Sequence, residues 1–185
     1  MKYLSLSTLL IAVLFAFSAC GGEQPAQQAQ QEDVTVDDGV RTIDIIGTDN
    51  MRFVVREAAD GLVTGGAAGR YILLEAIEAA PGEEIRIRLT TESNMPPTAM
   101  SHNLAVVDLG TDLDRFTREA LQAADNAYIP PAMEDRVIAT TAMLGAGQTD
   151  TITFTVPETE GEYDYICSFP GHFQGGMVGK LIVSE

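Results

Sequence analysis

Three side chains near the carboxyl end of the chain, a thiol, an imidazole and a thioether, follow one another at even spacing. Cys167, His172 and Met177 form the pattern Cys-x4-His-x4-Met. A thiolate, imidazoles and a weak, long axial thioether are the donors of an electron-transfer copper site. The chain has one further histidine, His102, which can supply a second imidazole. These four residues therefore predict a mononuclear centre with one copper ion per chain.

Each donor taken alone has a more ordinary interpretation. A lone cysteine is often a small buried hydrophobe, and a methionine usually fills a core. The combination changes the interpretation, because both histidines of the chain fall where such a site needs them. The other cysteine, Cys20, follows an N-terminal leader, so Cys167 has no predicted disulfide partner. A metal explains an unpaired thiol in an exported protein well.

The segments that must position these donors have the residue pattern of β-strands. Apolar and polar residues alternate, or β-branched residues gather, at 42–45, 85–89, 104–107, 151–156, 162–166 and 180–183. Proline and glycine turns separate these segments. Many short strands joined in this way predict an all-β sandwich or barrel. One loop between two strands would carry Cys167, His172 and Met177, and His102 would come from another strand.

Two stretches depart from the strand pattern. Residues 57–70 contain four glycines and predict a flexible insertion. Residues 111–124 predict a helix that Thr111 can cap, with Asp112 and Asp114 in its first turn. Its apolar face would consist of Leu113, Phe116, Ala120, Leu121 and Ala124. The result would be one short helical insertion near 111–125 in an otherwise all-β domain.

The N-terminal end has the features of an export signal. A single basic residue precedes an apolar run at 9–17, far shorter than the roughly 20 residues of a membrane-spanning helix. The sequence Phe17-Ser18-Ala19-Cys20 resembles the lipobox of bacterial lipoproteins. That resemblance implies a signal peptide over 1–19 and lipid attachment to Cys20. The alternative is an ordinary cleaved signal, which keeps the export and loses the anchor.

The remaining chain divides into a tether and one domain. Residues 20–39 have almost no bulky apolar side chain after Cys20 and predict a disordered tether. Residues 40–185 would form the folded domain. The full chain has 27 acidic and 11 basic residues and a formal net charge of −16. This excludes a nucleic-acid surface, which would be basic. The acidic surface favours solubility and would steer a basic partner. The alternative, which we weigh equally, is an acidic surface suited only to the medium around the protein.

The segments around the donors resemble those of the azurins, which are cupredoxins with type 1, or blue, copper. Cys-Ser-Phe-Pro-Gly-His at 167–172 is similar to the azurin copper loop, and 94–103 is similar to the azurin stretch that ends in Met-Gly-His-Asn. Residues 43–53, 136–139 and 144–147 also resemble azurin. The resemblance implies a Greek-key β-sandwich or barrel of the cupredoxin type, with seven to eight strands.

Several features depart from the azurin pattern. Four residues separate His172 from Met177, as in the auracyanins, whereas azurins usually have three. Leu104 replaces a common tryptophan, and the azurin disulfide near the N-terminus is missing. The chain is therefore identified as an azurin/auracyanin-like cupredoxin with a bacterial lipoprotein signal.

The resemblance also implies roles for individual residues. The metal ligands would be three equatorial donors and one axial donor, namely His102, Cys167, His172 and Met177. The backbone carbonyl of Ser101 is a candidate for a weak additional contact, although azurins have glycine there. Asn103 would tie the two ligand segments together. Electrons would leave through His172, inside a docking patch of Met51, Met100, Phe169, Pro170 and Gly171.

The implied function is that of a single-electron carrier cycling between Cu(I) and Cu(II), and not of an enzyme. Its partners would be redox proteins, such as a cytochrome or an oxidase-type donor or acceptor, together with the membrane that holds the lipid. We expect an exported monomer, anchored in the periplasm or on the outer face of a membrane. The alternative is an exported copper-binding or copper-delivery protein. Copper redox enzymes need further histidines for additional copper centres, and none remains here.

Overall fold

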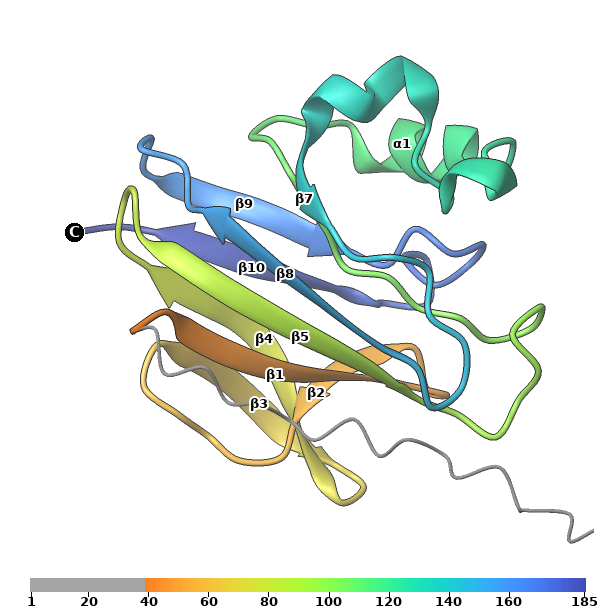
Figure 1. The fold of residues 1–185 in the computed structure, drawn as a ribbon, viewed down its shortest axis with the longest axis horizontal. Helices are drawn as coiled ribbons and strands as arrows, with labels where there is room; N and C mark the ends of the chain where they lie inside the picture. The colour runs from red at the N-terminus through yellow and green to blue at the C-terminus, as the bar shows by residue number, and fades with distance from the viewer. Residues whose placement is uncertain (1–38) are drawn as a thin grey trace, which may run out of the picture. The chain divides into compact units, whose positions relative to one another are not determined.

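A computed structural model describes residues 39–185, so the predicted signal peptide, Cys20 and the predicted tether up to residue 38 lie outside the described residues. The described part is dominated by strands (Figure 1). They are β1 (Arg41–Thr48), β2 (Arg52–Val55), β3 (Leu62–Ala68), β4 (Tyr71–Ala79), β5 (Glu84–Glu92), β6 (Ala105–Val107), β7 (Val137–Thr140), β8 (Thr149–Thr155), β9 (Gly161–Ile166) and β10 (Val178–Val183). Between β6 and β7 lie the helix α1 (Leu113–Ala120) and the 3-10 turns η1 (Ala124–Asn126) and η2 (Pro131–Arg136).

The strands belong to one sheet, which curls into a barrel-like sandwich. Their order is β7-β6-β9-β10-β4-β2-β1-β5-β8, and β3 pairs with β4 beside this path. The pairs β1/β5 and β10/β4 are parallel, and the other pairs are antiparallel. The two strands at the ends of the order, β7 and β8, also lie against each other. The predicted all-β fold is confirmed, with ten strands in the sheet instead of seven to eight.

Alternation along the strands builds the core. In β5 the side chains of Ile85, Ile87 and Leu89 point inward and are almost fully buried, while the residues between them are partly exposed. Burying one such side chain contributes about 1.5–3 kcal/mol. The same core includes Tyr165, Cys167 and Met177, so two of the four predicted donors are continuous with the apolar interior.

The predicted flexible insertion at 57–70 is wrong. Residues 62–68 form β3, which pairs antiparallel with β4 through register irregularities near Val63 and Thr64. A loop was predicted because the segment is rich in glycine. Composition does not show that backbone hydrogen bonds to β4 hold the segment as a strand. Gly65 lies so close to Glu75 that a Cβ there would be 2.4 Å from a carboxylate oxygen. At this position glycine therefore allows close packing within the hairpin.

The helical insertion is present but shorter than predicted. The side chain of Asp112, and not Thr111, caps α1 by accepting a hydrogen bond from the Arg115 amide. The helix ends at Ala120, so Leu121 is half exposed and lies outside the predicted apolar face. Ala124 is also exposed. The helix packs through Phe116 into a second cluster of buried residues, which comprises Ala105, Val107, Phe116, Ile129, Met133 and Ile166.

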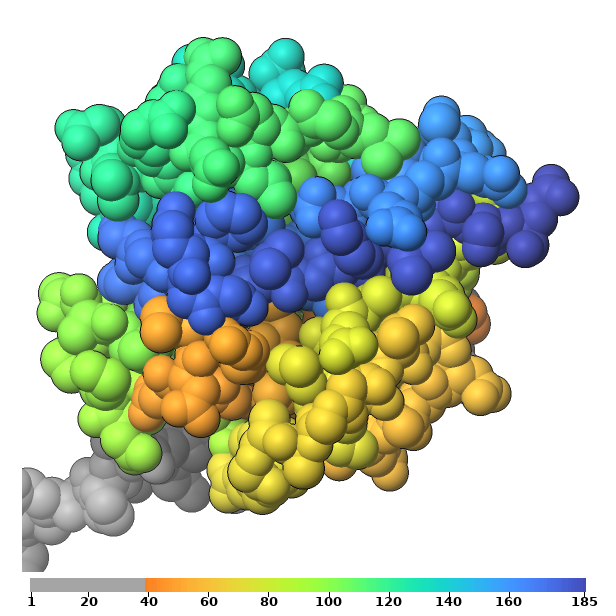
Figure 2. Space-filling model, turned by 180° about the vertical axis from the view of Figure 1, so that it is seen from behind, coloured from red at the N-terminus to blue at the C-terminus, as the bar shows by residue number. Residues whose placement is uncertain are grey.

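The last strands connect the two sides of the domain. From behind, the C-terminal segment forms a band between the helical insertion and the strands that begin the chain (Figure 2). β9 pairs with β6 on one side, and β10 pairs with β4 on the other. Because β9 ends at Ile166 and β10 begins at Val178, the loop with three of the predicted donors is fixed at both ends. No helix among residues 39–185 has the length and apolar character to cross a membrane.

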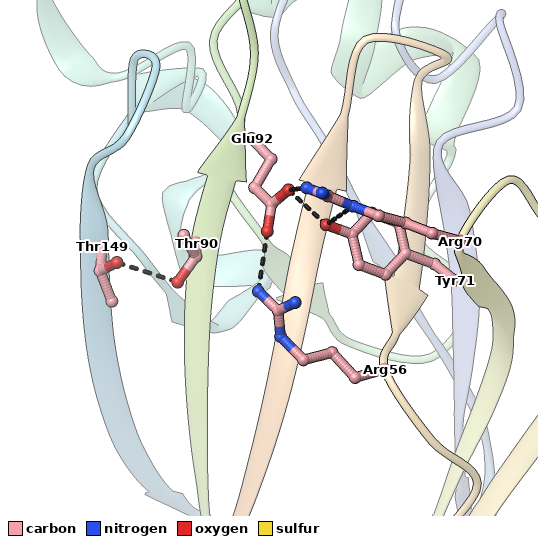
Figure 3. A network of polar contacts seen from close by, with 6 residues as sticks. All are labelled: Arg56, Arg70, Tyr71, Thr90, Glu92 and Thr149. Carbon is pink, nitrogen blue, oxygen red and sulfur yellow. Dashed lines mark hydrogen bonds and ion pairs between the residues drawn. The ribbon is translucent and has the colours of Figure 1, made fainter.

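A polar network ties the β3–β4 hairpin to the end of β5 (Figure 3). The carboxylate of Glu92 accepts hydrogen bonds from Tyr71, Arg70 and Arg56. The hydrogen bond from Tyr71 is the main reason that the pKa of Glu92 lies below its usual value, and Arg70 adds to this effect. Nearby, the hydroxyls of Thr90 and Thr149 lie 2.9 Å apart and link β5 to β8.

Candidate metal centre

Strand ends and a backbone bridge fix the segments that carry the donors. Cys167 comes directly after β9, and Met177 comes directly before β10. His172 lies in the loop between them. His102 lies between β5 and β6, where its backbone forms a two-way bridge with Leu144, with N···O distances of 2.9 and 2.8 Å.

Three donor atoms converge in the interior. The Nδ1 atoms of His102 and His172 lie 3.1 Å apart. The Sγ atom of Cys167 is 3.4 Å from Nδ1 of His172 and 3.9 Å from Nδ1 of His102. All three residues are buried, and among residues 39–185 they are the one group of histidine, cysteine or carboxylate side chains close enough to hold a metal ion together. Met177 is also fully buried and packs in the same core.

Backbone hydrogen bonds give the loop its shape. The amide of Cys167 donates to the carbonyl of Met177 at 3.1 Å, and the amide of Met177 donates to the carbonyl of His172 at 2.9 Å. These bonds connect all three donors of the loop. Gly171 and Gly176 have φ angles of +83° and +94°, a region that glycine adopts without the strain of a side chain. The loop is therefore a closed turn whose bends depend on its glycines.

Burial sets the protonation of the donors. The pKa of His102 falls to about 4, chiefly because burial disfavours the charged ring and then because of the neighbouring His172; Asp49 and the backbone of Thr48 oppose the change. Burial also lowers the pKa of His172 to about 4. The pKa of Cys167 rises to about 12, again mainly through burial. At neutral pH the metal-free site thus holds two neutral imidazoles and a thiol.

This donor set fits copper. The two Nδ1 atoms and the Sγ atom lie close enough together for all three to bind one cation. A His2Cys set with a methionine nearby is the donor set of electron-transfer copper sites. Hard cations such as Ca²⁺ and Mg²⁺ prefer oxygen ligands, and none of these four side chains offers an oxygen.

Asn103 links the two segments that carry the ligands. Its Oδ1 atom accepts a hydrogen bond from the Ser168 amide at 2.8 Å, and its Nδ2 donates to the Ser168 hydroxyl at 2.8 Å. Both residues are buried. Asn103 follows His102 and Ser168 follows Cys167, so this clamp fixes the separation of the two metal-binding segments. The carbonyl of Ser101 also faces the site, at 3.9 Å from Sγ of Cys167.

The residues of the predicted docking patch differ in exposure. Gly171 is exposed, and Met51 and Pro170 are partly exposed. Met100 and Phe169 are 7% and 9% exposed, and His172 itself is 3% exposed. Any contact surface over the site must therefore come mainly from the residues around the imidazole. The assignment of this patch to partner docking stays a prediction.

Two residues that contact the site were not singled out from the sequence. Gly47 lies against the ring of His102, where a Cβ would be 2.7 Å from Cδ2. Arg52 donates a hydrogen bond to the carbonyl of Gly175 in the metal-binding loop. Both belong to the β1–β2 hairpin, far from the donors in sequence. The one sequence signal for such a contact is the Gly175-Gly176 pair, because two residues without side chains leave room for a close neighbour.

Comparison with known proteins gives a consistent result. Residues 59–184 match the family model described as copper binding proteins of the plastocyanin/azurin family. Auracyanin-B of Chloroflexus aurantiacus is 37% identical over 101 residues, which are 54% of this chain and 41% of that protein. Azurin of Alcaligenes faecalis is 39% identical over 118 residues, which are 63% of this chain and 91% of the azurin. The chain thus spans less than half of auracyanin-B but most of the azurin.

The fold comparison agrees with the sequence comparison. The structure of auracyanin A, a blue copper protein of Chloroflexus aurantiacus, superposes with a TM-score of 0.61 at 25% identity. The superposition covers 79% of this chain and all of that chain. The architecture is therefore shared over 79% of this chain with a blue copper protein.

Proposed function

Because the chain belongs to the plastocyanin/azurin family of copper binding proteins, we propose that it carries single electrons between redox proteins through one type 1 copper. The observation that carries this proposal is the convergence of Cys167 Sγ with two imidazole nitrogens in a buried site. Met177, which begins the return into β10, is the fourth ligand. The copper would supply the Cu(I)/Cu(II) couple.

The protein's own residues provide a rigid, dry site. Cys167 and His102 are fully buried, and the hydrogen bonds of Asn103 and of the loop backbone fix the two segments that carry them. Since the donors already converge, little rearrangement is needed when the charge of the centre changes. Such preorganisation suits repeated electron transfer.

The same features argue against the alternatives. A delivery protein must release its metal readily, whereas here the ligands are buried and fixed from two segments. Further copper centres would need further histidines, and His102 and His172 are the two that the chain has. We therefore favour a carrier without substrate turnover.

The decisive experiment is to load the full chain with Cu(II) and record visible absorption and electron paramagnetic resonance beside Cys167→Ser. We expect an intense blue band and a narrow copper hyperfine splitting, both lost in the variant. Reversible one-electron voltammetry should accompany them. A colourless protein with an ordinary square-planar copper signal would refute the site, and rapid transfer of copper to a metal-free acceptor would favour delivery.

We further propose that the protein is exported and tethered to a membrane by a lipid on Cys20, as its lipobox-like sequence implies. Incorporation of labelled palmitate that persists in Cys20→Ser would rule out the anchor.

The partner surface is proposed to surround His172, with Met51, Pro170 and Gly171 as its accessible parts. Apolar side chains allow close approach, and a small contact area permits fast release, as a transient carrier needs. A cytochrome or an oxidase-type protein is the expected partner. Replacing Pro170 by Glu should slow electron exchange with a partner while leaving the visible spectrum intact; equal rates in the two proteins would exclude this surface.

A further inference from the structure

The turn between β1 and β2 contacts the loop that carries His172 and Met177. Resting on the metal centre proposed above, we propose that Arg52 is a positioning residue for this loop. Its guanidinium joins the turn to Gly175, and this contact sets where the following Met177 thioether lies. No charged side chain occurs within 168–177, so a charged donor for the loop must come from elsewhere in the chain.

The geometry of the contact is specific. Nη1 of Arg52 donates to the carbonyl of Met51 at 2.8 Å and to the carbonyl of Gly175 at 2.5 Å. One nitrogen thus bridges two segments that are 123 positions apart in the sequence. Hydrogen bonds from a charged group are stronger than those between neutral groups. Arg52 is also partly buried, which reduces the competition from water.

The loop has two glycines where the turn approaches it. A Cβ on Gly175 would lie 2.7 Å from Sδ of Met51, and a Cβ on Gly176 would lie 3.0 Å from Nη1 of Arg52. Gly176 also has a φ of +94°, which disfavours any other residue. The loop backbone therefore rests directly on the turn. Met51 itself has a φ of +55°, held by the hydrogen bond from its amide to the Thr48 carbonyl at 2.9 Å.

The contact between Arg52 and Gly175 explains how a loop one residue longer than that of most azurins can remain ordered. Four residues separate His172 from Met177, and each added residue increases the entropy that must be lost on closure. Gly175 and Gly176 are the last two of those four. Fixing them leaves Met177 with one defined approach, which its hydrogen bond to His172 completes. Arg52 thus acts through the loop backbone and does not touch the metal.

The test compares Arg52→Met and Arg52→Lys in the full chain. Methionine keeps the apolar stem and removes charge and donor, whereas lysine keeps both. Arg56→Met is the matched control, because Arg56 follows the same strand but pairs with Glu92 on the β5 side. The first measurement is amide hydrogen exchange of 175–177 in the metal-free protein. The second is the visible spectrum, paramagnetic resonance and reduction potential of the copper form.

We expect Arg52→Met to speed exchange at 175–177 about tenfold, which corresponds to about 1.4 kcal/mol, and to shift both the spectrum and the reduction potential. Arg52→Lys should recover most of the protection, and Arg56→Met should leave all of these properties unchanged. If Arg52→Met does not fold, Arg52→Gln replaces it, as a neutral variant that can still donate. Loosening of the loop by that variant would also support the proposal.

Two results would overturn the proposal. One is unchanged exchange and an unchanged copper spectrum in the neutral variant. The other is a shift of the reduction potential alone, without faster exchange, which would reduce Arg52 to a remote charge. Failure of the copper proposal itself would be recognised separately, because the wild-type protein would then show no blue band. The exchange measurement on metal-free protein would still decide the role of Arg52.

Discussion

The metal-free protein should lose stability in mild acid because two buried imidazoles must remain neutral. His102 and His172 have pKa values of about 4 in the folded chain, against an ordinary value of 6.5. Between these values the unfolded chain binds more protons than the folded one, so acid favours unfolding. The stability is fully present above pH 6.5 and is lost as the pH falls toward 4.

The size of the effect follows from the two pKa values. At pH 5 each histidine should reduce the free energy of unfolding by about 2 kcal/mol relative to pH 7.5, and the pair by about 4 kcal/mol. This is a large part of the roughly 5–15 kcal/mol by which domains are stable. Glu83 and Glu92 have pKa values below 4.5 and contribute at lower pH. The window from pH 7.5 to 5 therefore isolates the histidines.

The assay is urea unfolding of chelator-treated protein at several pH values within this window. His172→Gln should remove about half of the pH dependence, and His102→Gln should do the same. Bound copper should suppress the loss, since the metal occupies the nitrogens that would take up protons. A free energy of unfolding that stays constant from pH 7.5 to 5 in the metal-free protein would refute the reasoning.

Three further predictions concern single residues. Burial raises the pKa of Cys167 to about 12, and the histidines are already neutral at pH 7. Binding of Cu(II) at pH 7 should therefore release one proton per ion, which a pH indicator can measure. The variant Cys167→Ser should release none. The buried hydroxyl of Tyr165 has no hydrogen-bond partner among residues 39–185. Tyr165→Phe should therefore leave the free energy of urea unfolding unchanged or raise it by about 1 kcal/mol. A clear decrease in this free energy would indicate a partner such as bound water. A Cβ at Gly47 would collide with the His102 ring. Gly47→Ala should therefore alter the paramagnetic resonance spectrum of the copper form and destabilise the metal-free chain by about 1–3 kcal/mol. An unchanged spectrum would contradict the contact.

Much of the fold was readable because the strands have clear period-two patterns. The expectations for 85–89 and 151–156 correspond to β5 and β8. The pattern failed at 62–68, where glycine-rich sequence forms β3. Backbone hydrogen bonds to β4 stabilise this strand, and the residue pattern of a short segment does not predict them. The helix cap was also misplaced by one residue, because Asp112 and Thr111 both suit a cap and only the backbone path decides between them.

The chemistry of the centre can be inferred from residue types and spacing. Cys167, both histidines and Met177 are soft or borderline donors, and three of them lie within one short loop, so their types and spacing predict a copper site. The tertiary structure alone decided how they are held. Leu144 brings in His102, Asn103 clamps the two segments through Ser168, and Arg52 reaches the loop from 123 positions away. Contacts between residues so far apart in the sequence form only when the sheet curls. The curl is stabilised by the whole core, so no short stretch of sequence predicts these contacts.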